Sequence, residues 1–175
     1  KEALPWVDRL SAAGSTDINR ALLEAASLTS EARSQERPAY LIFLTDGLPT
    51  EGEVEPEKII ANFAGAPSGL RLFAFGVGYD VDTFLLDSLA QEHHGASYYV
   101  RPGELLDEAL STFYTKISTP VLTDLSLDFG SASVYDIYPS PLPDLFAGSE
   151  IIVVGRYRQP GPIEATLTGK VNGKE

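Results

Sequence analysis

The chain has 175 residues, a formal net charge of -12 and no cysteine. The lack of cysteine excludes disulfides, thiolate zinc sites and cysteine nucleophiles, and the acidic balance excludes nucleic acid as a partner because such a surface repels phosphate backbones. A hydrophobic fraction of 43% and a charged fraction of 22% are typical of a globular protein, and no apolar run is long enough for membrane insertion.

The first part of the chain has two helical patterns. One predicts a helix over residues 2–13, and the other predicts a helix that is capped by the polar residues 15–17. A polar loop over residues 33–38 separates the second helix from the next element. The apolar residues at helical spacing are Leu4, Val7 and Leu10 in the first helix and Ile18, Leu22, Ala25 and Ala26 in the second.

Strands and helices alternate in the next stretch. Three short apolar runs predict strands over residues 40–44, 70–77 and 96–100. Three stretches with apolar residues at helical spacing predict helices over residues 55–64, 81–93 and 104–117. This alternation predicts parallel βα units. The first strand is apolar on both faces, which is typical of a strand in the middle of a covered sheet.

After Pro120 the apolar residues recur with period two, which is typical of antiparallel strands with one solvated face. Strands are predicted over residues 124–129, 134–138, 150–157 and 163–171. We therefore predict an α/β unit over residues 1–118 and a β-rich segment over residues 119–175. That segment ends at Asn172-Gly173, a hairpin signal without a following strand, and the chain begins at Lys1 with no methionine anywhere. We expect it to be a fragment of a longer protein.

Asp46 is the strongest candidate for a functional residue. It follows the apolar run 40–44, and open α/β sheets bind ligands at the carboxyl ends of their strands. Thr16 begins the helix that precedes this strand, so both side chains can converge on one crevice. A hydroxyl and a carboxylate are hard oxygen ligands that suit Mg²⁺ or Ca²⁺. The alternative is that Asp46 only forms a turn with its own backbone.

Two other patterns carry weaker hypotheses. His93 and His94 are adjacent at a predicted helix end, where the helix dipole favours histidine, so we interpret them as structural. The glycines in Gly76-Val77-Gly78 follow a strand and precede a helix, as in a dinucleotide-binding loop, but Val81 stands where the third glycine belongs. A nucleotide-binding α/β enzyme fragment is therefore the alternative function.

Several separated motifs resemble a known family. The segments GSTDIN (residues 14–19), LIFLTDG (41–47) and FAFGVG (73–78) are similar to the later half of a von Willebrand factor type A domain. Other segments are similar to the inter-alpha-trypsin inhibitor heavy chains and their bacterial relatives. These are LPTEGE (48–53), GYDVD (78–82), HG (94–95), STP (118–120) and FAGSEIIVVG (146–155).

The resemblance implies a partial doubly wound, Rossmann-like parallel sheet followed by an antiparallel β unit. It also implies a metal-ion-dependent adhesion site, in which three loops hold Mg²⁺ or Ca²⁺ and a carboxylate from a partner protein completes the coordination. One loop supplies an Asp-x-Ser-x-Ser motif, the second a threonine and the third an aspartate. Thr16 matches the threonine and Asp46 the aspartate. The implied function is protein binding outside the cell, at the cell surface or in the periplasm, and not catalysis.

The chain departs from this pattern because it lacks the Asp-x-Ser-x-Ser loop. Asp124-Leu125-Ser126-Leu127-Asp128 is only superficially similar, because its polar residues alternate along a half-solvated strand. We expect the metal site to be incomplete here and Mg²⁺ binding to be weak or absent. A third reading is that the site is degenerate and the domain serves only as a scaffold.

The missing strand has a second consequence. In the resembled family it lies beside the strand that ends at Asp46, so the edge of residues 40–44 is expected to be bare and apolar. Exposed apolar edges pair with another strand. We expect this edge to be covered by a neighbouring copy, through self-association, or by further chain.

Overall fold

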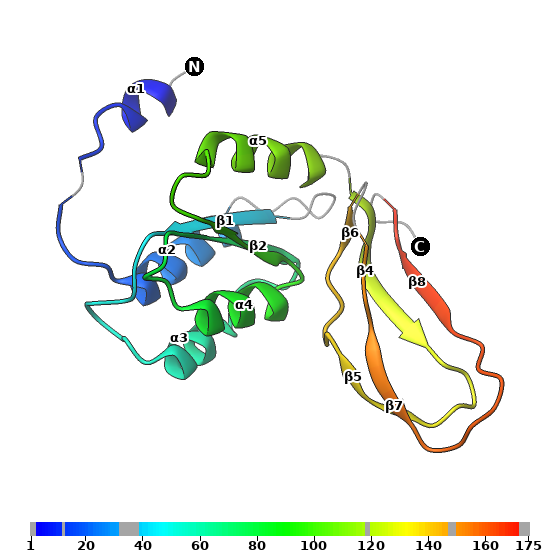
Figure 1. Cartoon of the computed structure of the whole chain (residues 1–175). Helices are drawn as coiled ribbons and strands as arrows, with labels where there is room; N and C mark the ends of the chain where they lie inside the picture. The colour runs from blue at the N-terminus through cyan, green and yellow to red at the C-terminus, as the bar shows by residue number, and fades with distance from the viewer. Residues whose placement is uncertain (1–2, 12, 32–38, 118–119, 147–149, 172–175) are drawn as a thin grey trace.

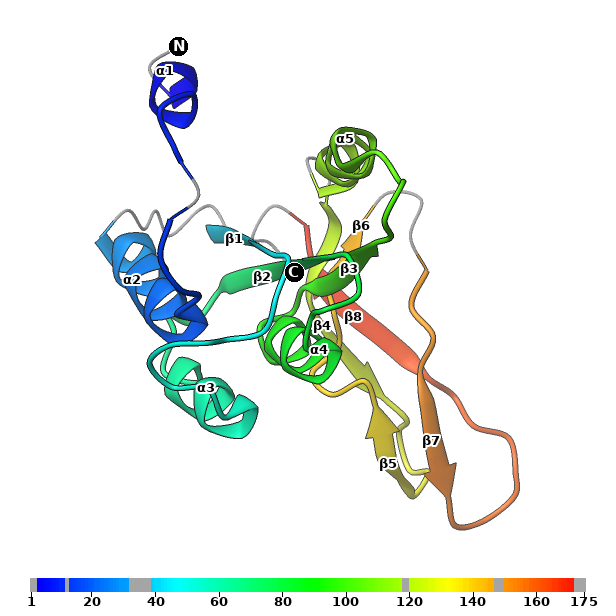
Figure 2. The ribbon, with the colours of Figure 1, turned by 60° about the vertical axis from the view of Figure 1, so that its left-hand side comes forward.

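The computed structural model describes residues 3–11, 13–31, 39–117, 120–146 and 150–171 (Figure 1). An α/β unit and an antiparallel β unit lie side by side in both views of the ribbon (Figures 1 and 2). The elements of the α/β unit are α1 (Ala3–Val7), α2 (Ile18–Glu31), β1 (Ala39–Thr45), α3 (Pro56–Phe63), β2 (Leu70–Val77), α4 (Thr83–Glu92), β3 (Ala96–Val100) and α5 (Leu106–Ile117).

The sheet of the α/β unit is parallel, as predicted. Its described strands run in the order β1-β2-β3, and β1 pairs with β2 in continuous register along its whole length. The middle strand is therefore β2, whose residues 70–76 are all buried. Within the described residues β1 lies at the edge of the sheet, which agrees with the bare edge expected for residues 40–44. Apolar residues on both faces of β1 reflect packing against cores on both sides, because Leu41 contacts one core and Tyr40 the other.

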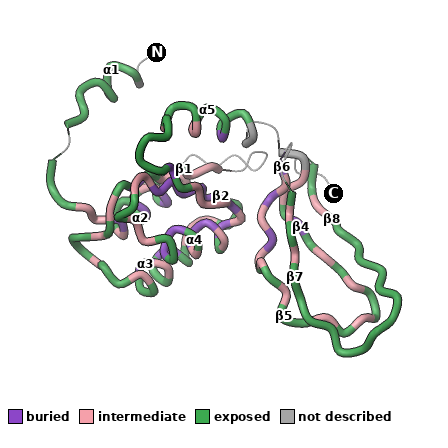
Figure 3. The backbone as a smooth tube through the Cα atoms, viewed as in Figure 1, coloured by how far each residue is buried: buried purple, intermediate pink, exposed green. Residues whose placement is uncertain are grey.

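The two faces of the sheet have separate cores. Helices α2, α3 and α4 cover one face and α5 covers the other (Figure 2). On the first face the buried residues include Leu22 of α2, Ile59 of α3 and Leu89 of α4. On the second face Phe113 of α5 packs edge-on against Phe73, with ring centroids 5.0 Å apart. This two-sided cover is typical of a doubly wound sheet and explains why β2 is the most buried strand (Figure 3).

The predicted helices are confirmed from α2 to α5, with ends that differ by a few residues. The first predicted helix is much shorter than residues 2–13, because α1 ends at Val7. Its apolar residues Leu4 and Leu10 are exposed, since no described element covers them. Phe84 of α4 is also exposed. The predicted loop over residues 33–38 lies outside the described residues.

The β unit is antiparallel, as its period-two pattern predicts. Strands β4 (Pro120–Asp128), β6 (Leu145–Phe146) and β8 (Thr166–Lys170) form one sheet, and β5 (Val134–Tyr138) pairs with β7 (Val154–Tyr157). The short strand β6 was not predicted, and β7 begins later than the predicted strand 150–157. The hairpin signal at residues 172–173 and the predicted unit boundary at residues 118–119 lie outside the described part.

The two units share side-chain contacts. Phe146 of β6 is buried in the α5-side core, with its ring centroid 5.8 Å from that of Phe73. Arg71 of β2, with a side chain only 3% exposed, forms ion pairs with Asp144 and Asp124 of the β unit. These contacts lie near the amino end of β2, so the carboxyl ends of the strands remain clear of the β unit.

Candidate functional site

Thr16 and Asp46 lie on two loops that the structure joins directly. Thr16 comes just before α2, and Asp46 comes just after β1. The Thr16 amide donates to Thr50 Oγ1 at 2.9 Å, and the Thr50 amide donates back to the Thr16 carbonyl at 2.9 Å. The Glu51 amide donates to the same carbonyl at 3.2 Å. The loop that follows Asp46 is therefore fastened to the loop that carries Thr16, at the carboxyl end of β1.

The start of α2 holds the Thr16 loop in place. The carboxylate of Asp17 accepts a hydrogen bond from the Arg20 amide at 2.9 Å, so Asp17 caps the helix as the polar residues 15–17 predicted. Ser15 Oγ donates to the carboxylate of Glu51 in the facing loop. Thr16, between these two fixed neighbours, is half-buried. Its position is thus set by the helix cap on one side and by the second loop on the other.

The turn after β1 leaves the carboxylate of Asp46 available. Thr45 Oγ1 donates to the Gly47 carbonyl at 3.0 Å, so the turn is closed by the threonine. Asp46 is exposed, and its carboxylate forms no hydrogen bond with the residues that the structure describes. The alternative that Asp46 only satisfies its own turn is therefore not supported.

A glycine that sequence reasoning did not single out lets the two loops meet. Gly52 has a φ of +69°, and a Cβ there would lie 2.6 Å from Asp17 Oδ2. Any side chain at this position would displace the carboxylate that caps α2. Glu51 and Glu53 lie in the loop before α3, which begins at Pro56. In the sequence, the only indication of this role for Gly52 was its position between two glutamates.

The donors at this place fit part of a cation site. A threonine hydroxyl and an aspartate carboxylate are oxygen ligands of the kind that Mg²⁺ and Ca²⁺ take, but both ions need about six or more. Within the described residues no three histidine or acidic side chains are grouped closely enough to hold a metal ion. Thr16 and Asp46 offer two oxygen donors, and the described residues do not supply further ligands as a cluster.

The glycines of Gly76-Val77-Gly78 do not form a phosphate cradle. A Cβ on Gly76 would lie 2.8 Å from the ring of Tyr99 and 3.0 Å from Val81 Cγ2. The Gly78 amide donates to the Val100 carbonyl at 2.9 Å, so it is not available for an anion. Gly76 is explained by close packing between β2, β3 and the loop before α4, and Gly78 by its φ of +90°.

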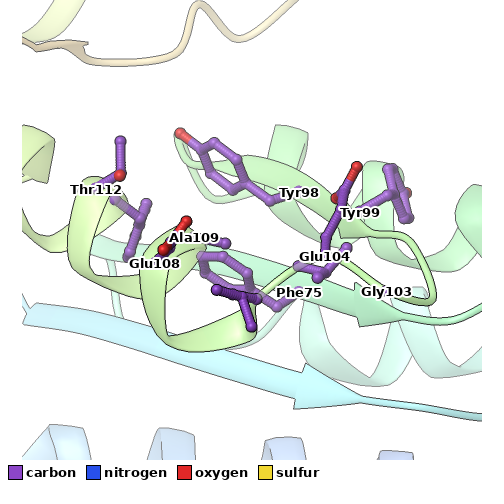
Figure 4. A pocket seen from close by; sticks show the side chains of 11 residues that line it. Phe75, Tyr98, Tyr99, Gly103, Glu104, Glu108, Ala109 and Thr112 are labelled. Carbon is purple, nitrogen blue, oxygen red and sulfur yellow. The ribbon is translucent and has the colours of Figure 1, made fainter.

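A pocket of about 550 Å³ lies between β3 and α5 (Figure 4). Tyr98 forms one wall, Glu108 and Thr112 form the other, and Phe75 lies between them. Burial raises the pKa of Tyr98, which keeps its phenol neutral. The described lining of the pocket has no histidine, serine or basic side chain.

The sequence matches known proteins over most of its length. The family described as the von Willebrand factor type A domain matches residues 1–112. The inter-alpha-trypsin inhibitor heavy chain H2 of Sus scrofa is 31% identical over 162 residues, which cover 89% of this chain and 17% of that protein. Heavy chain H4 of Homo sapiens is 34% identical over 170 residues, which cover 93% of this chain and 18% of that protein. The chain thus spans less than a fifth of the length of these relatives.

Solved structures show the same fold. A von Willebrand factor type A protein from Catenulispora acidiphila superposes with a TM-score of 0.60 and 21% identity, over 92% of this chain and 39% of that one. The ArnB paralog VWA2 from Sulfolobus acidocaldarius superposes with a TM-score of 0.54 and 19% identity, over 91% and 39% of the two chains. None of the described helices is long and apolar enough to cross a lipid bilayer.

Proposed function

Because the chain belongs to the von Willebrand factor type A family, we propose that it is part of a metal-dependent module that binds another protein. The proposal is for recognition and not for catalysis. It is supported by the family match and by Gly76, which packs against Tyr99 and Val81 where a nucleotide-binding loop would need open space. A nucleotide-binding enzyme fragment, the alternative from the sequence, gains no support from that loop.

The observation that carries the proposal is the pair of hydrogen bonds between Thr16 and Thr50. They bring the threonine loop to the loop that follows Asp46, which is the arrangement a shared cation needs. The Thr16 hydroxyl and the Asp46 carboxylate are proposed as two of the ligands. When bound, Mg²⁺ or Ca²⁺ would supply an open coordination position for a carboxylate of the partner protein.

The remaining protein ligands are proposed to come from an Asp-x-Ser-x-Ser loop outside these 175 residues. Asp46 is the one charged ligand proposed here, and a single carboxylate with one hydroxyl does not compete well with the hydration of Mg²⁺. This chain alone is therefore expected to bind Mg²⁺ weakly or not at all. By its family the intact protein is proposed to act outside the cell, at the cell surface or in the periplasm.

Calorimetric titration with Mn²⁺ and Mg²⁺ tests the residue assignment. The 175-residue chain is expected to show no binding in the micromolar range. A longer natural chain that contains the Asp-x-Ser-x-Ser loop is expected to bind Mn²⁺. There Asp46→Asn should weaken affinity by at least the roughly tenfold loss that follows removal of an outer-shell partner.

Asp80→Asn is the matched control, because Asp80 is an exposed aspartate on the next strand-to-helix loop of the same sheet. It should leave the affinity unchanged. Micromolar binding by the 175-residue chain would show that the site is complete without the missing loop. Equal effects of Asp46→Asn and Asp80→Asn on the affinity would show that Asp46 is not a metal ligand. If the longer chain did not bind Mn²⁺ either, the alternative that the domain serves only as a scaffold would be favoured.

A further inference from the structure

The groove between β3 and α5 brings aromatic rings and carboxylates together (Figure 4). Phe75 lies at its bottom and is fully buried, and Tyr98 forms the β3 wall with a side chain that is only half-buried. Glu108 stands on the α5 wall, one turn before Thr112, and Glu104 lies in the turn that follows β3. The described lining therefore has two carboxylates and no basic side chain to neutralise them.

The rings of the groove are held in place by their own packing. Phe75 and Tyr98 stack with ring centroids 5.1 Å apart and 16° between their planes. Phe113 packs edge-on against both rings, with its centroid 4.9 Å from that of Phe75 and 5.1 Å from that of Tyr98. A ligand that lies against Tyr98 therefore meets a ring whose position is already fixed, which lowers the entropy cost of binding.

The two carboxylates of the groove are not paired with a cation of the described chain. Glu108 forms no hydrogen bond or ion pair with any residue that the structure describes. Glu104 accepts a hydrogen bond from the backbone amide of Arg101 at 3.1 Å, and the described residues offer its carboxylate no ion pair. The helix dipole favours acidic residues at the start of α5, but it does not require an accessible aromatic ring opposite them. Together the rings and the carboxylates are complementary to a cation.

We propose that this groove binds an arginine side chain of a partner protein, with the guanidinium against the ring of Tyr98 and its N–H groups donating to the carboxylate of Glu108. A guanidinium is planar, stacks on aromatic faces and presents a fork of donors that matches a carboxylate. It is also more weakly hydrated than the ammonium of lysine, so it loses less on leaving water. The net charge of -12 attracts cationic segments to this surface and repels acidic ones.

The groove lies on the side of the sheet away from β1. Its described lining comes from β2, β3, α5 and the turn between β3 and α5, and includes no residue of β1. In the order β1-β2-β3, a further strand beside β1 lies on the side opposite to β3. The lining also includes neither Thr16 nor Asp46, so arginine binding needs no metal ion.

The groove and the proposed metal loop follow the same ends of parallel strands. Glu104 comes after the carboxyl end of β3 and Asp46 after that of β1, and strands two apart in a sheet are separated by about 10 Å. One partner protein could therefore place a carboxylate on the metal and an arginine in the groove. This consequence rests on the proposed function, whereas arginine binding itself does not.

Saturation-transfer NMR tests the proposal on the natural protein that contains these residues, with EDTA present and ionic strength held constant. The probes are N-acetyl-arginine amide, its lysine counterpart and its citrulline counterpart, which has nearly the shape of arginine and no charge. The arginine probe should bind with a dissociation constant of about 1 mM, the affinity that a ligand of this size reaches at an ordinary contribution per atom. The lysine probe should bind at least about threefold more weakly, because it does not stack or form the fork. The citrulline probe should show no saturable signal.

Single substitutions place the arginine probe in the groove. Glu108→Gln should weaken its binding about fivefold, the upper range for an exposed ion pair. Glu57→Gln is the matched control, because Glu57 is an exposed glutamate in the first turn of α3, and it should leave the affinity unchanged. Tyr98→Leu should weaken binding about two- to fivefold through loss of the ring, whereas Tyr98→Phe should retain most of the affinity. Glu108 is exposed, so its variant tests the groove even if Tyr98→Leu does not fold.

Three results would overturn the proposal. The first is no saturable binding of the arginine probe, or binding equal to that of the citrulline probe, which would mean that the groove does not recognise the charge. The second is equal affinity for the arginine and lysine probes, which would mean that it does not recognise the planar group. The third is an equal effect of Glu108→Gln and Glu57→Gln, which would assign the binding to the overall negative charge. None of these readouts uses metal, so failure of the proposed function would leave them unaffected.

Discussion

His93, at the end of α4, is buried in a setting that disfavours its charge. It is 9% exposed, and its ring packs edge-on against Phe63 with centroids 4.7 Å apart. Its Nε2 atom has no hydrogen-bond partner among the described residues. Burial, with a smaller contribution from His94, lowers the pKa of His93. The sequence indicated a structural role through the helix dipole, but the structure favours the neutral ring as a packing group.

This burial makes stability depend on pH. The unfolded chain binds a proton near pH 6.5, whereas folded His93 resists it, so the free energy of unfolding falls as pH drops below 6.5. The loss should approach about 1.4 kcal/mol per pH unit until the lowered folded pKa is reached. Urea denaturation at pH 7.5, 6.5 and 5.5 measures it. His93→Gln should flatten the dependence in this window, and an unchanged slope would assign it to other groups.

At the level of elements, the sequence predicted the helices and strands whose type is decided by residues close together in the chain. The strand β2 was placed correctly because it is a mostly apolar run between turns, interrupted only by Arg71, and α3 because its apolar spacing follows an entry proline. The edge position of β1 and the short length of α1 depend on which neighbours cover them, and no local pattern records that. Thr16 and Asp46 were predicted from motifs and remain predictions, whereas the Thr16–Thr50 bonds and the role of Gly52 join distant residues and were not predicted.

The packing of α4 on the sheet depends on Gly95. A Cβ there would lie 1.7 Å from the Leu72 carbonyl oxygen, so the chain after α4 could not lie against β2 as it does. Gly95→Ala should cost about 3 kcal/mol or more, at or beyond the upper end of ordinary overpacking. Gly65→Ala is the control, because nothing lies within 4 Å of its Cβ position, and it should change stability by less than about 0.5 kcal/mol. Equal denaturation midpoints for the two variants would contradict this account.

For the whole molecule, one buried arginine connects the two units. Arg71 Nε lies 2.6 Å from Asp144 Oδ2, and both side chains are almost fully buried. Asp144 Oδ1 also accepts from the Asp124 amide at 3.0 Å, while Lys170 Nζ lies 3.1 Å from Asp124 Oδ2 at the surface. The β-rich segment is therefore held to β2 by charge as well as by Phe146. The boundary at residue 118 remains a prediction, but it separates units that we expect to unfold together.

Removing Asp144 should break this connection. Asp144→Ala leaves the guanidinium of Arg71 buried with one of its two carboxylates, which should cost about 3–5 kcal/mol. Lys170→Gln removes only an exposed pair and should cost less than about 1 kcal/mol.

Hydrogen exchange in increasing urea should show β2 and β4 losing protection together in the natural chain. In Asp144→Ala, β4 should lose its protection first. The double variant Arg71→Met, Asp144→Leu should recover part of the loss, because two apolar side chains leave no buried charge unpaired. Equal costs for Asp144→Ala and Lys170→Gln would mean that Arg71 does not hold the units together.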